Sequence, residues 1–120
     1  MEFKGISRVF STVGERQYHT IGAFWDELSK RYGRENLRGV GHNWTDTSIE
    51  YVIGLIDGEI DGWNASVSLP EDGWKRVEGK TEDLAKLYRE IYKDGPLSAE
   101  IERFDDEGNC IIDFVRSFSN

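Results

Sequence analysis

Two segments of the chain carry hydrophobic side chains at the three- and four-residue spacing of an amphipathic helix. The first covers residues 16–32 and is followed by Gly33, a residue that commonly ends helices. The second covers residues 81–93, has acidic residues in its first turn, and is stopped by Asp94-Gly95-Pro96. The pattern therefore predicts two helices about sixty residues apart.

The rest of the chain alternates between hydrophobic and polar positions, as strands do, and is interrupted by turn residues. The predicted strands are residues 5–11, 38–44, 48–56, 63–69, 74–79, 99–104 and 110–118. The order is strand–helix–strand–strand, a connecting strand, and then strand–helix–strand–strand again. This order predicts a single α+β domain over residues 1–120, with halves of about 1–58 and 59–120. We expect an antiparallel sheet with one face under the helices and the other face free.

The composition and the net charge exclude some classes of function. Hydrophobic residues make up 38% of the 120 residues and aromatic residues 12%, enough for one folded core. The 15 Lys and Arg against 23 Asp and Glu give a formal charge of −8, and no basic cluster exceeds a dipeptide. We therefore expect no nucleic-acid partner, because such binding needs a basic surface, and a weak preference for cations instead.

The remaining residue counts exclude several kinds of site. Cys110 is the single cysteine, so no internal disulfide can form, and with His19 and His42 it is too few for a Cys/His metal cluster. No metal and no cofactor are expected. The sequence has no long apolar run and no signal-peptide pattern at its start, which predicts no membrane segment and a cytoplasmic location.

Two short motifs do not fit the sites they resemble, and a third motif is absent. Residues 57–62 (Asp-Gly-Glu-Ile-Asp-Gly) begin like a calcium loop, but Ser68 stands where the bidentate Glu is required. Gly39-Val40-Gly41 lacks the third glycine of a nucleotide fingerprint and precedes no helix. No serine lies in a Gly-x-Ser-x-Gly turn, so nucleophilic catalysis finds little support.

The aromatic residues are more informative. Trp25 lies on the hydrophobic stripe of the first helix, where a core role and a ligand-binding role are equally reasonable. Trp63 and Trp74 begin predicted strands beside turns, where large rings tend to be partly exposed and can stack on flat cations or aromatic ligands.

The predicted strand at 99–104 carries the second informative feature. Its alternation places Glu100, Glu102 and Phe104 on one face. A carboxylate beside an aromatic ring on a sheet suits a lipophilic cation, whereas the alternative is a solvated edge with Glu102 paired to a lysine. We expect Glu102 to be at least partly buried in a cleft, with no lysine or arginine within ion-pair distance.

The order of motifs resembles the GyrI-like effector-binding domain, the small-molecule-binding module of bacterial multidrug-sensing transcription regulators. Stand-alone and integron-cassette forms also occur in this family. The resemblance rests on residues 21–25 (Ile-Gly-Ala-Phe-Trp), 50–54 (Glu-Tyr-Val-Ile-Gly), 69–79 and 102–104 (Glu-Arg-Phe). Phe104 replaces the tyrosine usual in the family, and no DNA-binding segment precedes residue 1, so we expect the stand-alone form.

The resemblance implies two βαββ units related by a pseudo-two-fold axis, with an aromatic cleft and a buried glutamate between them. Carried over by position, it assigns the glutamate to Glu102 and ligand contacts to Phe104, Trp25, Tyr51 and Trp74. We add Trp63 and Glu100 to the expected ligand-binding residues because of their positions in predicted strands, and the resemblance does not support these two.

Three functions stay open at this point. The first is binding of lipophilic, cationic or aromatic small molecules. The second is metal-free hydrolysis of strained cyclopropane-bearing toxins, with Glu102 as the catalytic carboxyl group. The third is protein interaction, as a gyrase inhibitor or as the detached sensor of a separate regulator protein. A homodimer is a further expectation.

Overall fold

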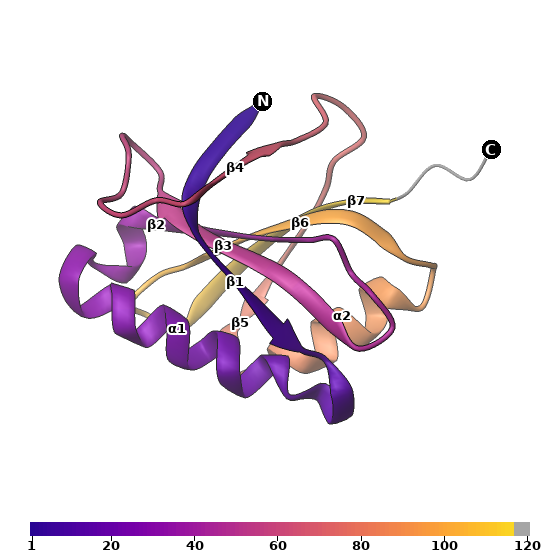
Figure 1. Cartoon of the computed structure of the whole chain (residues 1–120). Helices are drawn as coiled ribbons and strands as arrows, with labels where there is room; N and C mark the ends of the chain where they lie inside the picture. The colour runs from indigo at the N-terminus through magenta and orange to yellow at the C-terminus, as the bar shows by residue number, and fades with distance from the viewer. Residues whose placement is uncertain (117–120) are drawn as a thin grey trace.

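The computed structural model of the 120-residue protein describes residues 1–116. Seven strands form one antiparallel sheet, and two α-helices lie on the same side of it (Figure 1). The helices are α1 (Gln17–Tyr32) and α2 (Leu84–Tyr92). The strands are β1 (Glu2–Ser11), β2 (Leu37–His42), β3 (Ser48–Leu55), β4 (Ala65–Ser68), β5 (Lys75–Lys80), β6 (Leu97–Phe104) and β7 (Asn109–Arg116). The predicted α+β class with an antiparallel sheet is confirmed.

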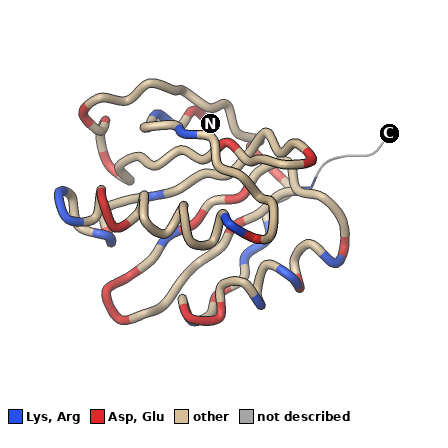
Figure 2. Tube along the Cα trace, turned by 60° about the horizontal axis from the view of Figure 1, so that its bottom comes forward, with Lys and Arg blue, Asp and Glu red and all other residues tan. Residues whose placement is uncertain are grey.

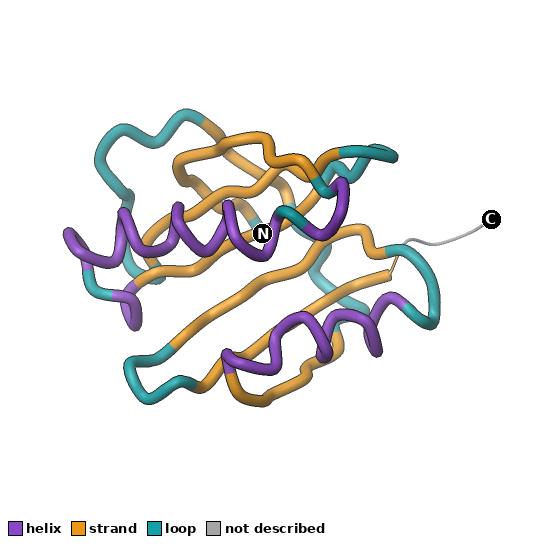
Figure 3. Tube along the Cα trace, turned by 90° about the horizontal axis from the view of Figure 1, so that it is seen from below, coloured by secondary structure: helices purple, strands orange, loops and turns teal. Residues whose placement is uncertain are grey.

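The strand order is β4-β1-β3-β2-β6-β7-β5, so the two halves of the chain meet where β2 pairs with β6. Within the first half β1 pairs with β3, and within the second half β5 pairs with β7, while β4 pairs back onto β1. Seen from the helix side in Figure 3, α1 and α2 lie next to each other with strands crossing between them. The middle of the sheet therefore lies between the two helices.

The hydrophobic stripes of both helices face the sheet, as the spacing predicts. Phe24, Trp25 and Leu28 are the buried residues of α1, and Tyr88 and Ile91 are those of α2. The second helix differs from the prediction at its start, because residues 81–83 form a 3₁₀ turn and the α-helix begins only at residue 84.

The far face of the sheet is not free, which corrects our expectation. Val40 and Val52 on this face are fully buried in a cluster with Phe3 and Val67. Residues 2–5 of β1 pair with β4, which lies above the other strands in Figure 1, whereas residues 6–11 pair with β3. The change of partner comes at Gly5, where a Cβ would lie 2.5 Å from the Ile53 carbonyl oxygen. The chain thus covers its own sheet on the side away from the helices.

Several boundaries also differ from the predicted ones. Trp63 and Trp74 do not begin strands, since β4 starts at Ala65 and β5 at Lys75. The expected end of the last strand at residue 118 lies outside the described residues. Neither described helix combines the length and apolar character needed to cross a bilayer.

Candidate functional site

A cleft of about 300 Å³ opens between α1 and α2, over the middle of the sheet. Its walls come from both helices and its floor from β6. Five aromatic side chains line it: Tyr18, Trp25, Tyr88, Tyr92 and Phe104. The cleft therefore offers a mostly apolar, aromatic surface of the kind that small organic ligands occupy.

Glu100 and Glu102, called the carboxyl pair from here on, are the acidic groups of this floor. Strand alternation turns both toward the helices, as predicted. Each is only 4% exposed, and neither forms an ion pair within residues 1–116. Burial of two unpaired carboxyl groups is unfavourable for folding and marks this point of the sheet as a candidate site.

A buried hydrogen-bond chain holds Glu102. The Trp25 indole Nε1 donates to the Tyr51 hydroxyl at 2.8 Å, and that hydroxyl donates to Glu102 Oε1 at 2.5 Å. The Trp25 ring also packs edge-on against Phe104, with ring centroids 4.8 Å apart. Helix α1, strand β3 and strand β6 are thereby joined across the boundary between the two halves.

Two glycines of β2 make room for this arrangement. Gly39 pairs with Glu102, and Gly41 pairs with Glu100. A Cβ on Gly39 would lie 2.1 Å from the Tyr51 hydroxyl oxygen, and one on Gly41 would lie 2.7 Å from Glu100 Oε1. Side chains at these positions would displace the groups of the site.

Three further phenols surround the carboxyl pair. The Tyr92 hydroxyl donates to Glu100 Oε2 at 3.2 Å. The Tyr88 ring stacks on Tyr92 at 5.6 Å between centroids and lies 6.2 Å from that of Tyr18. The buried Tyr88 hydroxyl has no hydrogen bond of regular geometry within the described residues.

Burial raises the pKa of both members of the pair. Desolvation is the main cause at each, and the charge of Glu102 raises the pKa of Glu100 further. The Tyr51 hydroxyl opposes the effect at Glu102, the Tyr92 hydroxyl opposes it at Glu100, and the nearby Tyr88 hydroxyl opposes it at both. The two carboxyl groups therefore titrate as a coupled pair, and at higher pH than exposed carboxyl groups do.

The phenols around the pair stay neutral. Burial raises the pKa of Tyr18 to about 12 and holds those of Tyr51, Tyr88 and Tyr92 above the ordinary value. The negative charge of the pair adds to this effect at all four groups. Tyr51 and Tyr92 therefore keep the hydroxyl protons that they donate to Glu102 and Glu100.

Four of the expected site residues lie at the cleft: Glu100, Glu102, Phe104 and Trp25. Tyr51 lies beneath it, fully buried, with its hydroxyl on Glu102.

The structure does not bring Trp63 or Trp74 to the cleft, which corrects our expectation for both. Trp63 is 42% exposed in the loop before β4, with Lys4 Nζ 4.9 Å from its ring. Trp74 packs against the cluster on the far face of the sheet, and its indole donates to the Pro70 carbonyl.

The phenols of α2 and the glycines of β2 were missed as site residues. Tyr88 and Tyr92 lie at the helical spacing of the second hydrophobic stripe, and this spacing does not distinguish core residues from ligand-binding residues. The alternation of Gly39 and Gly41 within a strand is a usable signal, because glycine there indicates close approach by another group.

The rim of the cleft adds little charge. Arg34 is the basic residue lining it, and its guanidinium is bound to Asp26 at 2.5 Å. Glu82 also lines it and is exposed. Elsewhere, Figure 2 shows Lys and Arg positions interspersed with Asp and Glu over the described chain. The carboxyl pair thus contributes most of the electrostatic field inside the cleft.

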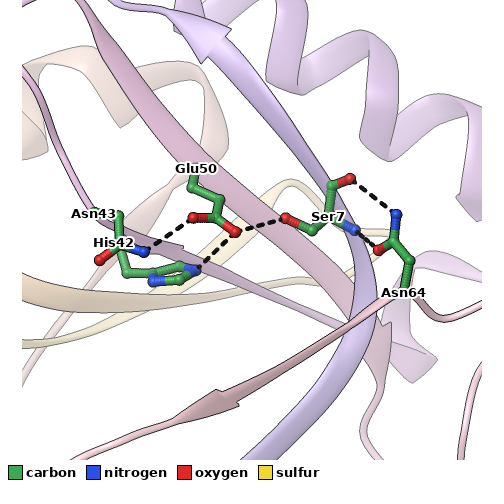
Figure 4. Close-up of polar contacts among 5 residues, drawn as sticks. All are labelled: Ser7, His42, Asn43, Glu50 and Asn64. Carbon is green, nitrogen blue, oxygen red and sulfur yellow. Dashed lines mark hydrogen bonds and ion pairs between the residues drawn. The ribbon is translucent and has the colours of Figure 1, made fainter.

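A second polar cluster lies on the far face of the sheet (Figure 4). Glu50 accepts hydrogen bonds from Asn43 Nδ2 at 2.9 Å and from the Ser7 hydroxyl at 3.1 Å, and His42 Nε2 is 3.8 Å away. Asn64 binds the Ser7 backbone through its side chain. The Asn43 hydrogen bond is the main cause that lowers the pKa of Glu50.

This cluster holds a serine, a histidine and an acid, but it does not form a nucleophilic triad. The Ser7 hydroxyl binds Glu50 rather than His42, so the serine–histidine contact of a triad is not formed. Within residues 1–116 no group of three or more His, Cys, Asp or Glu side chains is placed to hold a metal ion.

The comparisons with protein-family models, curated proteins and solved structures found no match to this chain.

Proposed function

We propose that the cleft between α1 and α2 binds lipophilic small molecules that are cationic or aromatic. The observation that carries the proposal is the carboxyl pair, buried among aromatic rings without a basic partner. A cation in the cleft would supply the missing positive charge and would contact ring faces at the same time. One such contact contributes only ~1–2 kcal/mol, so micromolar affinity is the expected range.

The proposal extends to the architecture that the GyrI-like resemblance implies. The strand orders β1-β3-β2 and β6-β7-β5 support a pseudo-two-fold axis between the halves, near the β2–β6 boundary. On this view the cleft lies between the two units, as in an effector-binding domain. A cytoplasmic location and a bacterial origin belong to the same proposal.

The first test uses Glu102→Gln. The substitution removes the buried charge and retains an acceptor for the Tyr51 hydroxyl. We expect the variant to melt at a higher temperature near neutral pH and to bind N-methyl-4-phenylpyridinium, a flat monocation, at least ~10-fold more weakly. Thermal unfolding and titration calorimetry measure the two effects.

The matched control is Glu90→Gln on the exposed side of α2, which should change neither quantity. Neutral 4-phenylpyridine tests the charge requirement of the ligand. A Glu102→Gln variant that melts lower and binds the cation as well as the parent would make Glu102 a structural residue.

A second function is favoured by the burial of two carboxyl groups with raised pKa values in one cleft. With one of the pair protonated and the other ionised, the cleft would hold a general acid and a general base. Hydrolysis of a strained cyclopropane would then use Glu102 to take a proton from water as its oxygen attacks the ring, with Glu100 returning a proton to the opened product. Incubation with a cyclopropane-bearing alkylating agent, followed by product analysis, distinguishes hydrolysis from binding. Recovery of the unaltered compound would exclude hydrolysis and leave binding as the function of the cleft.

Protein interaction is the weakest alternative. It would require acids gathered on one surface to mimic DNA, whereas acidic and basic residues are interspersed in Figure 2. A supercoiling assay without inhibition at micromolar protein would exclude the gyrase version.

A further inference from the structure

The carboxyl pair offers two negative charges, although a monocation needs only one. Both groups are buried in the same cleft, and Arg34 at its rim is already bound to Asp26. The other groups that face the pair are the exposed Glu82 and the neutral phenols. After a monocation binds, one carboxyl group would still lack a positive partner.

Tyr88 adds a hydroxyl group beside the pair. It is 3% exposed and lines the cleft, and its hydroxyl has no hydrogen bond of regular geometry among the described residues. Because this hydroxyl lies close enough to both carboxyl groups to lower their pKa values, it can donate to either of them or to a ligand in the cleft.

The spacing of the pair limits the ligand. The Cα atoms of alternate residues on one face of a strand lie about 6.6–6.8 Å apart, and this separation applies to the Cα atoms of Glu100 and Glu102. A rigid molecule with two positive centres about 7 Å apart can therefore place one centre near each carboxyl group. The aromatic walls require such a molecule to be flat and largely apolar.

Building on the proposed function, we infer that the cleft selects flat aromatic dications over monocations of the same shape, and that the second charge displaces one additional proton. A monocation pairs with one ionised carboxylate, and the other carboxyl group keeps its proton. A dication pairs with two carboxylates, so this second proton leaves to the buffer. The difference of one proton holds whether the free pair carries one proton or two.

Two probes of one shape test the inference: methyl viologen, which carries two permanent charges, and N-methyl-4-phenylpyridinium, which carries one. Neither titrates, so any proton released comes from the protein. Calorimetric titrations near pH 7 in two buffers of different ionisation enthalpy give both the affinity and the proton count. We expect methyl viologen to bind about tenfold more tightly and to release about one proton more.

The variant Glu100→Gln should remove both differences. Its affinity for methyl viologen should fall to within about threefold of its affinity for the monocation, and the two probes should release the same number of protons. Glu90→Gln, which makes the same change on the exposed side of α2, should preserve both differences.

The outcomes separate this inference from the proposed function. Monocation binding that depends on Glu102, together with equal affinity and equal proton release for the two probes, overturns the dication inference alone. Failure of both probes to bind overturns the proposed function and the inference with it.

Discussion

At the scale of single residues, Tyr51 has the most connected side chain of the site. Its hydroxyl accepts from Trp25 Nε1 and donates to Glu102, and its ring lies over Gly39. One oxygen atom thus satisfies a buried indole and a buried carboxyl group. Interactions of this kind are costly to break, because each partner would remain buried without its hydrogen bond.

Tyr51→Phe should therefore destabilise the protein by about 1–3 kcal/mol, since it leaves the Trp25 donor and the Glu102 acceptor unpaired. Chemical denaturation measures the loss. Tyr32→Phe is the matched control, because the buried Tyr32 hydroxyl has no hydrogen-bond partner within the described residues. We expect Tyr32→Phe to be neutral or stabilising. Equal effects of the two substitutions would show that the Tyr51 hydrogen bonds add no stability.

At the scale of elements, β2 is the strand that positions the site. Leu37 and Val40 are buried on opposite faces, while Gly39 and Gly41 leave the helix side of the strand open. Side chains from both neighbouring strands then lie over β2, so Tyr51 from β3 can reach Glu102 on β6. Larger side chains at Gly39 and Gly41 would fill this space and prevent the contact between Tyr51 and Glu102.

Gly39→Ala should destabilise the protein by at least about 1–3 kcal/mol, because the new methyl group would overlap the Tyr51 ring. The same substitution should weaken cation binding by displacing Glu102. Gly22→Ala in α1 is the control, since nothing lies within 4 Å of its Cβ position and alanine favours a helix by ~0.5–1 kcal/mol. The two alanine variants should thus shift the denaturation midpoint in opposite directions, and a shift in the same direction would contradict this view of β2.

Part of this arrangement was predictable from local patterns. The alternation of β6 correctly placed Glu100, Glu102 and Phe104 on one face, because that property depends on the strand alone. The positions of Trp63 and Trp74 were wrong, because both residues lie before their strands and no alternation governs them. The contact between Tyr51 and Glu102 depends on pairing of strands from different halves, which no local pattern contains.

At the scale of the whole molecule, the carboxyl groups act on stability in two opposite ways. Hydrogen bonds lower the pKa of Glu50 and Asp105, with Asn43 and Asn109 as the main donors. Such groups stabilise the fold above the unfolded pKa, and this contribution is lost as pH falls through the lowered folded pKa. The carboxyl pair has raised pKa values, so its favourable contribution is complete below the unfolded pKa and is lost as pH rises through the folded values.

These opposite effects predict a stability maximum at mildly acidic pH, close to the ordinary carboxyl pKa of about 4–4.5, rather than at neutral pH. Urea denaturation midpoints measured across this range should rise to the maximum and then fall as the pair ionises. Glu100→Gln, which removes the group with the further raised pKa, should flatten the fall above the maximum and leave the acidic side unchanged. Saturating N-methyl-4-phenylpyridinium should also reduce the fall, because a bound cation stabilises the ionised form of the pair. A midpoint that keeps rising to neutral pH in the parent protein would mean that the buried pair titrates like exposed carboxyl groups.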